Sequence, residues 1–181
     1  ALSPANFIAT NPEVLENIIS TQGQSIQKGI VNLLGDMKKG KVSQTDESAF
    51  EVGKNIATTE GHVVFRNELF ELIQYTPLTE TVFERPYLMV PPCINKYYIL
   101  DLQPDNSVVR HMVAQGHTVF LVSWKNPDAS MAAVSWDDYV GKGVIKAIEV
   151  VKEIGETQQI NILGFCVGGT LTTSARSEEH T

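Results

Sequence analysis

The residue best suited to chemistry is Cys166, which lies in the segment Gly164-Phe165-Cys166-Val167-Gly168-Gly169 near the end of the chain. An apolar stretch at residues 160–163 precedes this segment, and a helical pattern begins after it. In a nucleophile elbow, a short strand turns sharply into a helix and holds one nucleophilic side chain in the open. Gly164 and Gly168 suit such a turn, because a side chain at either position would collide with neighbouring backbone. The spacing therefore predicts an exposed thiol nucleophile at a strand-to-helix corner.

The alternative interpretation of Cys166 is a buried cysteine in a tight turn whose glycines serve packing alone. Free cysteine is commonly buried and inert in proteins. Two glycines at elbow spacing, directly behind a clean apolar strand, favour the nucleophile over this alternative.

The elements in front of the corner alternate between strand and helix. Apolar runs bounded by turn residues predict strands at 63–65, 69–75, 87–90, 118–122 and 160–163. The first two should form a hairpin around Arg66-Asn67, and the run at 87–90 should be a buried parallel strand that Pro91-Pro92 ends. Helices are expected from a cap at Asp105 or Ser107 to Gly116, and over residues 136–154. This order predicts an α/β fold.

The pattern of the first 48 residues predicts a helical region followed by a linker. Ser3-Pro4 and Asn11-Pro12 are helix-start signals, because a capping residue followed by proline suits the first turn. Apolar residues recur at helical spacing on one side from Val14 to Met37, and the basic run Lys38–Lys41 marks the end. We expect this stretch to pack on its own domain.

Composition indicates an ordinary globular protein, with 43% hydrophobic and 19% charged residues and a formal net charge of −7. The negative charge gives no reason to expect nucleic-acid binding. Two cysteines, no secretory signal at the start and no apolar run long enough to span a bilayer indicate a reducing cytosol. That compartment argues against a disulfide between Cys93 and Cys166.

The elbow segment resembles the lipase-like box of class I polyhydroxyalkanoate synthases, bacterial enzymes that polymerise (R)-3-hydroxyacyl-CoA. Other segments resemble the same family in its order, and the similarity runs from about Leu2 to about Thr173. These segments are residues 50–53, 91–101, 116–124 and 126–128.

The resemblance implies a truncated α/β-hydrolase fold, with its first strands up to the nucleophile elbow at 49–175, preceded by the small helical region at 1–48. It also implies an acyltransferase in which Cys166 carries a hydroxyacyl group taken from coenzyme A. Exchange of one thioester for another is nearly thermoneutral, so the acyl group stays activated for the next transfer. Coenzyme A arrives as part of the substrate, and neither a further cofactor nor a metal is implied.

Two backbone N–H groups are expected to stabilise the oxyanion. In this fold one belongs to the residue after the nucleophile, here Val167, and the other to the loop after the third strand. By resemblance we place the second donor at Ile94. Pro91 and Pro92 cannot serve because proline has no N–H.

The catalytic acid and base of the family are not matched in this chain. In this fold the order is nucleophile, acid, histidine, yet His62, His111 and His117 precede Cys166, and His180 follows it too closely. We read His111 as a helix-surface residue and His117 as a turn residue. The native sequence is expected to end near Ala175, with residues 176–181 a non-native tail that resembles adapter read-through, and the fragment is expected to be inactive.

The resemblance also implies partners: the substrate (R)-3-hydroxyacyl-CoA, the polyester granule, and a second copy of the full-length chain in a homodimer. The expected location is the cytoplasm, on polyhydroxyalkanoate granules. Two alternatives stay open. One is a thiol hydrolase of the same fold, which would transfer its acyl group to water. The other is a non-catalytic granule-binding or dimerisation module that uses the N-terminal helices.

Overall fold

The computed structural model describes residues 3–46 and 48–179, and the chain divides into two units, Ala1–Ala49 and Phe50–Thr181. The boundary expected from the sequence, between residues 48 and 49, lies next to this division. Each unit is described by itself below.

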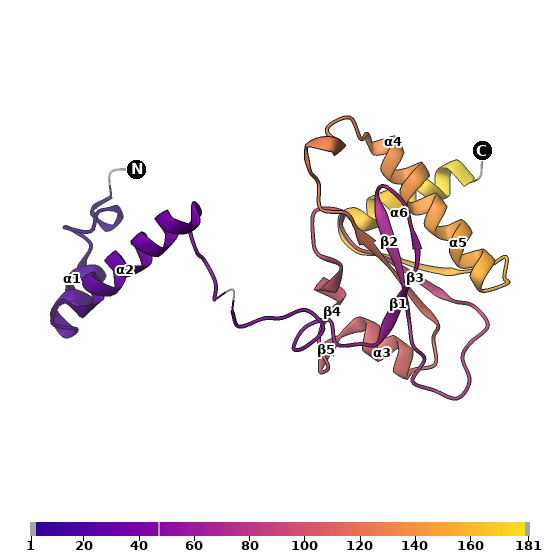
Figure 1. Ribbon diagram of the computed structural model, residues 1–181, viewed down its shortest axis with the longest axis horizontal. Coiled ribbons are helices and arrows are strands. Elements are labelled where there is room, and N and C mark those ends of the chain that lie inside the picture. The colour runs from indigo at the N-terminus through magenta and orange to yellow at the C-terminus, as the bar shows by residue number, and fades with distance from the viewer. Residues whose placement is uncertain (1–2, 47, 180–181) are drawn as a thin grey trace. The chain divides into compact units, whose positions relative to one another are not determined.

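The N-terminal unit consists of a short 3-10 turn, η1 (Pro4–Asn6), and two helices, α1 (Pro12–Ser20) and α2 (Gln24–Lys39) (Figure 1). The start signal at Asn11 is confirmed, because its side chain accepts hydrogen bonds from the N–H groups of Glu13 and Val14. The pattern from Val14 to Met37 is interrupted where Gln22 and Gly23 take positive φ angles of 50° and 84°.

The apolar face of these helices is not covered within the unit. Both helices lie wholly within the described residues, and neither buries a side chain. The expectation that this stretch packs on its own domain stays a prediction, because the unit by itself encloses no core. The reason is its size, since two short helices offer too little apolar surface to enclose a core. Exposed apolar residues of α2 are Ile26, Ile30, Val31, Leu33, Leu34 and Met37.

The second unit is built on a five-stranded mixed sheet with the order β1-β2-β6-β3-β7 (Figure 1). The strands are β1 (Gly61–Arg66), β2 (Phe70–Tyr75), β3 (Tyr87–Val90), β6 (Val119–Trp124) and β7 (Asn161–Gly164). As expected, β1 and β2 form an antiparallel hairpin. Strand β6 is antiparallel to β2 and parallel to β3, and β3 is parallel to β7.

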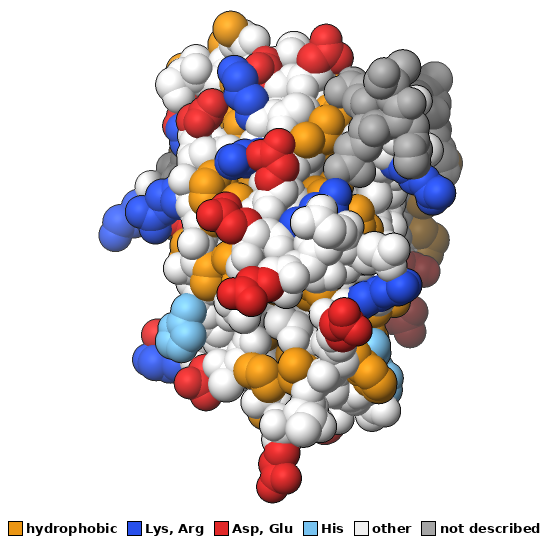
Figure 2. Space-filling model, turned by 90° about the vertical axis from the view of Figure 1, so that its right-hand side faces the viewer, with side chains coloured by type: hydrophobic (Ala, Val, Ile, Leu, Met, Phe, Trp, Pro, Cys, Tyr) orange, Lys and Arg blue, Asp and Glu red, His pale blue; other side chains and the backbone are white. Residues whose placement is uncertain are grey.

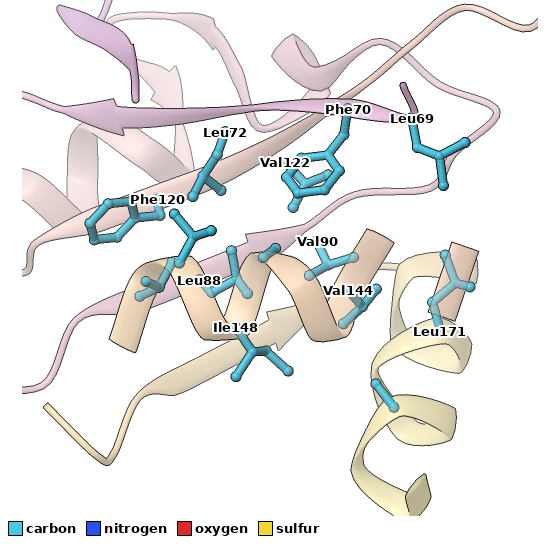
Figure 3. Packing of buried hydrophobic residues seen from close by; sticks show 14 of the residues in the cluster. Leu69, Phe70, Leu72, Leu88, Val90, Phe120, Val122, Val144, Ile148 and Leu171 are labelled. Carbon is cyan, nitrogen blue, oxygen red and sulfur yellow. The ribbon is translucent and has the colours of Figure 1, made fainter. Parts of the chain in front are cut away.

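Both faces of the sheet are covered, because the central strands are apolar on both sides. On one face, Phe70, Leu72 and Leu88 pack against Val144 and Ile148, the arrangement drawn in Figure 3. On the other face, Met89, Val119 and Leu121 pack against Val109 and Val113. A strand buried on both faces reads as a continuous apolar run, which is why the pattern predicted β3 and β6 well.

The helix on the second face is α3 (Val108–Ala114), capped by Ser107 and followed by Gly116 at φ 85°. It follows a small two-stranded sheet of β4 (Asp101–Gln103) and β5 (Asn106–Ser107), which the 3-10 turn η2 (Tyr97–Leu100) precedes.

The stretch expected to be one α-helix over 136–154 contains three segments. It begins as α4 (Trp136–Asp138), widens into a π-helix, η4 (Tyr139–Ile145), and continues as α5 (Lys146–Ile154). Tertiary packing explains the difference, because Gly143 lies directly against the indole of Trp124. Within the π-helix, Val140 and Val144 remain buried, so the apolar pattern alone did not reveal the change of helix type.

The final helix, α6 (Val167–Glu179), continues past the point where the sequence turns polar. Leu171 and Ala175, one turn apart, are fully buried and provide its apolar side. The hydroxyls of Thr172, Thr173 and Ser174 donate to carbonyls four residues earlier. The helix therefore keeps an apolar side as far as Ala175, and the polar residues are accommodated within the helix.

On the face of the molecule drawn in Figure 2, acidic and basic side chains are interspersed with apolar ones. Among residues 3–46 and 48–179, no helix is long and apolar enough to cross a membrane.

Candidate active site at the strand-to-helix corner

Cys166 occupies the corner between β7 and α6, and its side chain is exposed. Its φ angle is 53°, a left-handed conformation that non-glycine residues seldom adopt. A nucleophile elbow has this kind of strained residue, which points its side chain away from both the strand and the helix. The alternative of a buried cysteine does not agree with this exposure.

Two glycines make the corner possible. A Cβ atom on Gly168 would lie 1.9 Å from the carbonyl oxygen of Val90, and one on Gly164 would lie 2.5 Å from the Cα of Gly169. Both contacts are with backbone, which cannot rotate away as a long side chain can. The expected collision at these two positions is confirmed.

Hydrogen bonds fix the corner to the end of β3. The Phe165 N–H donates to the Val90 carbonyl at 3.0 Å, and the pairing of β3 with β7 places Val90 opposite Gly164. Within the turn, the N–H groups of Gly168 and Gly169 donate to the carbonyls of Phe165 and Cys166, each at 2.9 Å. The corner and the end of β3 therefore form one hydrogen-bonded structure.

The two expected oxyanion donors follow neighbouring strands. Val167 is the first residue of α6, where N–H groups have no acceptor within the helix and the helix dipole favours negative charge. Ile94 lies on the loop after β3, with its side chain 78% exposed. Because β3 and β7 are parallel and adjacent, both residues follow the same edge of the sheet. Their assignment as oxyanion donors stays a prediction.

The loop over residues 91–96 is held by polar contacts with other elements. The indole N–H of Trp124, at the end of β6, donates to the Pro91 carbonyl at 2.8 Å in a buried position. Lys96 donates to the side-chain oxygen of Asn126 at 2.6 Å. Sequence reasoning missed the role of Trp124. A tryptophan at the end of an apolar strand gives no local sign of the acceptor that it will meet.

The two cysteines lie in different surroundings, and both are free thiols. Cys93 is half-buried and packs against the core on the α5 side of the sheet. Burial raises the pKa of the Cys93 thiol, which lowers the fraction present as the nucleophilic thiolate. Cys166 is thus the more accessible of the two thiols.

None of the described histidines is brought to the corner by the sheet. His117 lies between the rings of Phe83 and Tyr87, with centroid distances of 4.8 and 5.1 Å, just before β6 begins. Because β6 and β7 run parallel, His117 lies at the opposite edge of the sheet from Cys166. His111 is exposed on α3, which confirms its reading as a helix-surface residue. His180 lies outside the described residues.

Two of the acidic residues, Asp101 and Asp138, form hydrogen bonds that have a structural role. Asp101 is 1% exposed and accepts hydrogen bonds from the hydroxyls of Thr59 and Ser107, both at 2.6 Å. Asp138 closes a capping box with Ser135 at the start of α4. Within the described part of the chain, no three His, Cys, Asp or Glu side chains are grouped as metal ligands.

Comparison with known proteins identifies the family. Residues 1–112 match the family model described as the N-terminus of poly-beta-hydroxybutyrate polymerase (PhaC). The chain is 63% identical over 175 residues to a poly(3-hydroxyalkanoate) polymerase subunit PhaC of Cupriavidus necator, covering 97% of this chain and 30% of that protein. It is 46% identical to a poly(3-hydroxyalkanoate) polymerase of Methylorubrum extorquens, covering 94% of this chain and 29% of that one.

A third relative, poly(3-hydroxyalkanoate) polymerase 2 of Ectopseudomonas oleovorans, is 44% identical, with 97% of this chain and 31% of that protein covered. The chain thus spans about three-tenths of the length of the curated relatives that it matches. The family model covers more than half of the chain, and the expected resemblance is confirmed. The chain belongs to the poly-beta-hydroxybutyrate polymerase (PhaC) N-terminus family.

Proposed function

We propose that this chain is the nucleophile-bearing part of an acyltransferase that polymerises (R)-3-hydroxyacyl-CoA into polyester and releases coenzyme A. The observation that carries the proposal is Cys166 itself, which is exposed, left-handed in conformation and placed at the N-terminus of a 13-residue helix. The names of the relatives agree with this reaction.

The proposed architecture is the first half of an α/β-hydrolase fold. Its support is the central mixed sheet with an antiparallel second strand, and the corner that directly follows a parallel strand. Unlike the usual hydrolase, the corner carries a thiol in place of a serine hydroxyl.

In the proposed acylation step, the Cys166 thiolate attacks the thioester carbonyl carbon and a tetrahedral oxyanion forms. The bond between that carbon and the coenzyme A sulfur then breaks, and coenzyme A leaves as a thiol after taking up one proton. The N–H groups of Val167 and Ile94 are the proposed donors to the oxyanion. Their value lies in being oriented before charge develops, and loss of one such donor typically lowers kcat by about 100- to 1000-fold.

In the transfer step, the hydroxyl of a second hydroxyacyl unit attacks the acyl-Cys166 thioester. A carbon–oxygen ester bond forms, the carbon–sulfur bond breaks, and the hydroxyl proton is removed by a base. None of the described histidines lies at the Cys166 edge of the sheet, so we propose that the base and its acidic partner belong to a part of the protein beyond this chain. The 181-residue chain alone is then expected to be inactive.

The proposed setting is the cytoplasm at the surface of a polyester granule, with a homodimer as the proposed state of the full-length protein. A second candidate function, granule binding or dimerisation without catalysis, is favoured by the uncovered apolar side chains of α2. Granule binding or dimerisation is also compatible with catalysis, because the two use different units of the chain.

The test is a chimera in which this chain replaces the matching segment of the Cupriavidus necator polymerase. We expect it to release coenzyme A from (R)-3-hydroxybutyryl-CoA and to form polymer, and Cys166→Ala to abolish both. Cys93→Ala, the matched cysteine control, should retain activity of the same order. Coenzyme A release by Cys166→Ala would contradict the proposal. Free hydroxy acid without polymer would indicate the thiol hydrolase instead.

A further inference from the structure

We propose that Trp124 is a positioning residue that holds the loop carrying Ile94 against the Cys166 corner. The inference rests on the proposed function, because it assigns a catalytic consequence to a contact outside the reacting groups. The contact itself is the hydrogen bond from the Trp124 indole N–H to the Pro91 carbonyl, 2.8 Å long and buried.

The Val90–Pro91 segment is where the corner and the loop meet. From one side, the Phe165 N–H donates to the Val90 carbonyl, and Gly168 lies so close that an added Cβ would be 3.0 Å from the Pro91 carbonyl carbon. From the other side, Trp124 donates to the next carbonyl along the chain. One short segment is thus bonded both to the nucleophile's turn and to β6.

The composition of the loop explains why a side-chain donor is needed there. Pro91 and Pro92 have no N–H, so the loop cannot continue the sheet's hydrogen-bond ladder through its own donors. The Asn95 N–H donates to the Pro92 carbonyl at 3.2 Å, which closes the loop on itself rather than on the sheet. The Ile94 side chain is 78% exposed and contributes little packing to hold its backbone in place. The Trp124 hydrogen bond therefore fixes the start of the loop together with the burial of Pro91 and Pro92.

Trp124 can do this because its own ring is held on several sides. It is 7% exposed, and the rings of Phe70 and Tyr139 approach it edge-on at centroid distances of 6.0 and 5.4 Å. Gly143 of the π-helix lies so close that an added Cβ would be 2.9 Å from Cζ3 and Cη2 of the indole. π-Helical turns occur frequently at functional sites, and this one provides a glycine where the indole needs space.

An alternative explanation is that the hydrogen bond from Trp124 has a structural role alone, because any buried indole N–H requires an acceptor. The two explanations predict different activities for the enzyme molecules that do fold. A structural role lowers the amount of folded protein, whereas a positioning role weakens the oxyanion interaction in every folded molecule. Turnover must therefore be measured per functional active site. The affinity for a ground-state analogue must also be measured separately from the affinity for an inhibitor that forms an oxyanion.

The experiment uses the active chimera described above, with Trp124→Phe, Gly143→Ala and the double variant. Trp136→Phe is the matched control, because Trp136 is the other tryptophan and is 44% exposed on α4. Turnover is expressed per Cys166 that becomes acylated in a single-turnover burst. Two inhibitors are compared: 3-hydroxybutyraldehyde, whose carbonyl Cys166 attacks to form a hemithioacetal, and a thioether analogue of the substrate, which has no reactive carbonyl.

We expect Trp124→Phe to lower kcat about tenfold with KM within about twofold, the pattern of an interaction made only in the transition state. Aldehyde affinity should fall by a similar factor while thioether affinity stays constant. Gly143→Ala should lower kcat and aldehyde affinity in the same way, because the new methyl displaces the indole. In the double variant it should add no further loss, because phenylalanine lacks the ring atoms that the methyl would contact. Trp136→Phe should leave all four quantities unchanged.

The proposal is overturned if Trp124→Phe leaves kcat per site unchanged, if both inhibitors weaken equally, or if the two substitutions are additive. Failure of the proposed function gives a different result, since turnover would then survive Cys166→Ala. Amide hydrogen exchange of the 181-residue chain gives a readout that needs no activity. Trp124→Phe should accelerate exchange at Asn95 about tenfold relative to residues 171–175 of α6, and equal acceleration of both would refute a local role.

Discussion

Gly168→Ala is the substitution that tests most directly whether the corner is built as described. The new Cβ would lie 1.9 Å from the Val90 carbonyl oxygen, whereas real Cβ atoms essentially never come closer than 3.0 Å to another heavy atom. The turn would have to move away from β3 by more than 1 Å. That shift would also disturb the hydrogen bond from the Phe165 N–H to the same carbonyl, now 3.0 Å long.

Overpacking of a well-packed site typically costs about 1–3 kcal/mol, and loss of one hydrogen bond costs about 1 kcal/mol more. Both colliding groups are backbone, so little relaxation through side-chain rotation is available. We therefore expect Gly168→Ala to lower the free energy of unfolding by about 3 kcal/mol.

The adjacent glycine provides a matched control. A Cβ on Gly169 would lie 3.3 Å from its nearest neighbour, the Gly164 carbonyl oxygen, which requires a shift of only a few tenths of an ångström. Gly169→Ala also gains the helix propensity of alanine over glycine, about 1 kcal/mol, so its net effect should be close to zero. Urea unfolding of the 181-residue chain, followed by circular dichroism, measures both variants. Equal stability of Gly168→Ala and Gly169→Ala would refute the close contact between α6 and β3.

Two further predictions concern ionisable groups. Iodoacetamide at pH 8 should alkylate Cys166 faster than Cys93, because burial raises the Cys93 pKa and half-encloses its sulfur. Peptide mass spectrometry of a labelling time course measures both rates. Faster labelling of Cys93 would contradict the placement of the two thiols. The Ser135 N–H, the Lys142 ammonium group and the Ser135 hydroxyl all donate hydrogen bonds to the Asp138 carboxylate. Together they hold the pKa of Asp138 well below its usual range. A carboxyl group with a depressed pKa stabilises the folded state above its unfolded pKa of about 3.9. That contribution is lost as the pH falls through the folded pKa. Asp138→Asn should therefore be less stable than the unsubstituted chain at pH 7 by urea unfolding, and the difference should shrink below about pH 4. A difference independent of pH would show that the carboxylate charge is not responsible.

The sequence patterns that predicted well were those read within a few residues. Tyr87 to Val90 gave a buried strand because an uninterrupted apolar run suits a strand covered on both faces. The cap at Asn11 and the stop at Gly116 followed from side-chain and backbone preferences that operate within one turn.

The patterns that failed involved partners distant along the chain. The π-helix at 139–145 keeps the apolar spacing of an α-helix, and the close approach of its Gly143 to Trp124 involves a residue far away in the sequence. Ala175 is buried in the core cluster that contains residues of β2, β3 and α5, although its sequence neighbours are polar. The helices at 12–20 and 24–39 have a clear apolar side, yet the pattern does not say what covers it.

By itself, the order of residues determined that a strand ends close to Gly164, that a helix follows, and that a cysteine lies between them, because glycine spacing and apolar runs act over a few residues. The tertiary structure alone decided that β6 lies between β2 and β3, that Cys93 is half-buried, and that Trp124 reaches the Pro91 carbonyl. The physical reason is the range of the interactions involved. Local preferences act on neighbouring residues, whereas burial and the partners of side-chain hydrogen bonds depend on segments that meet only when the chain has folded.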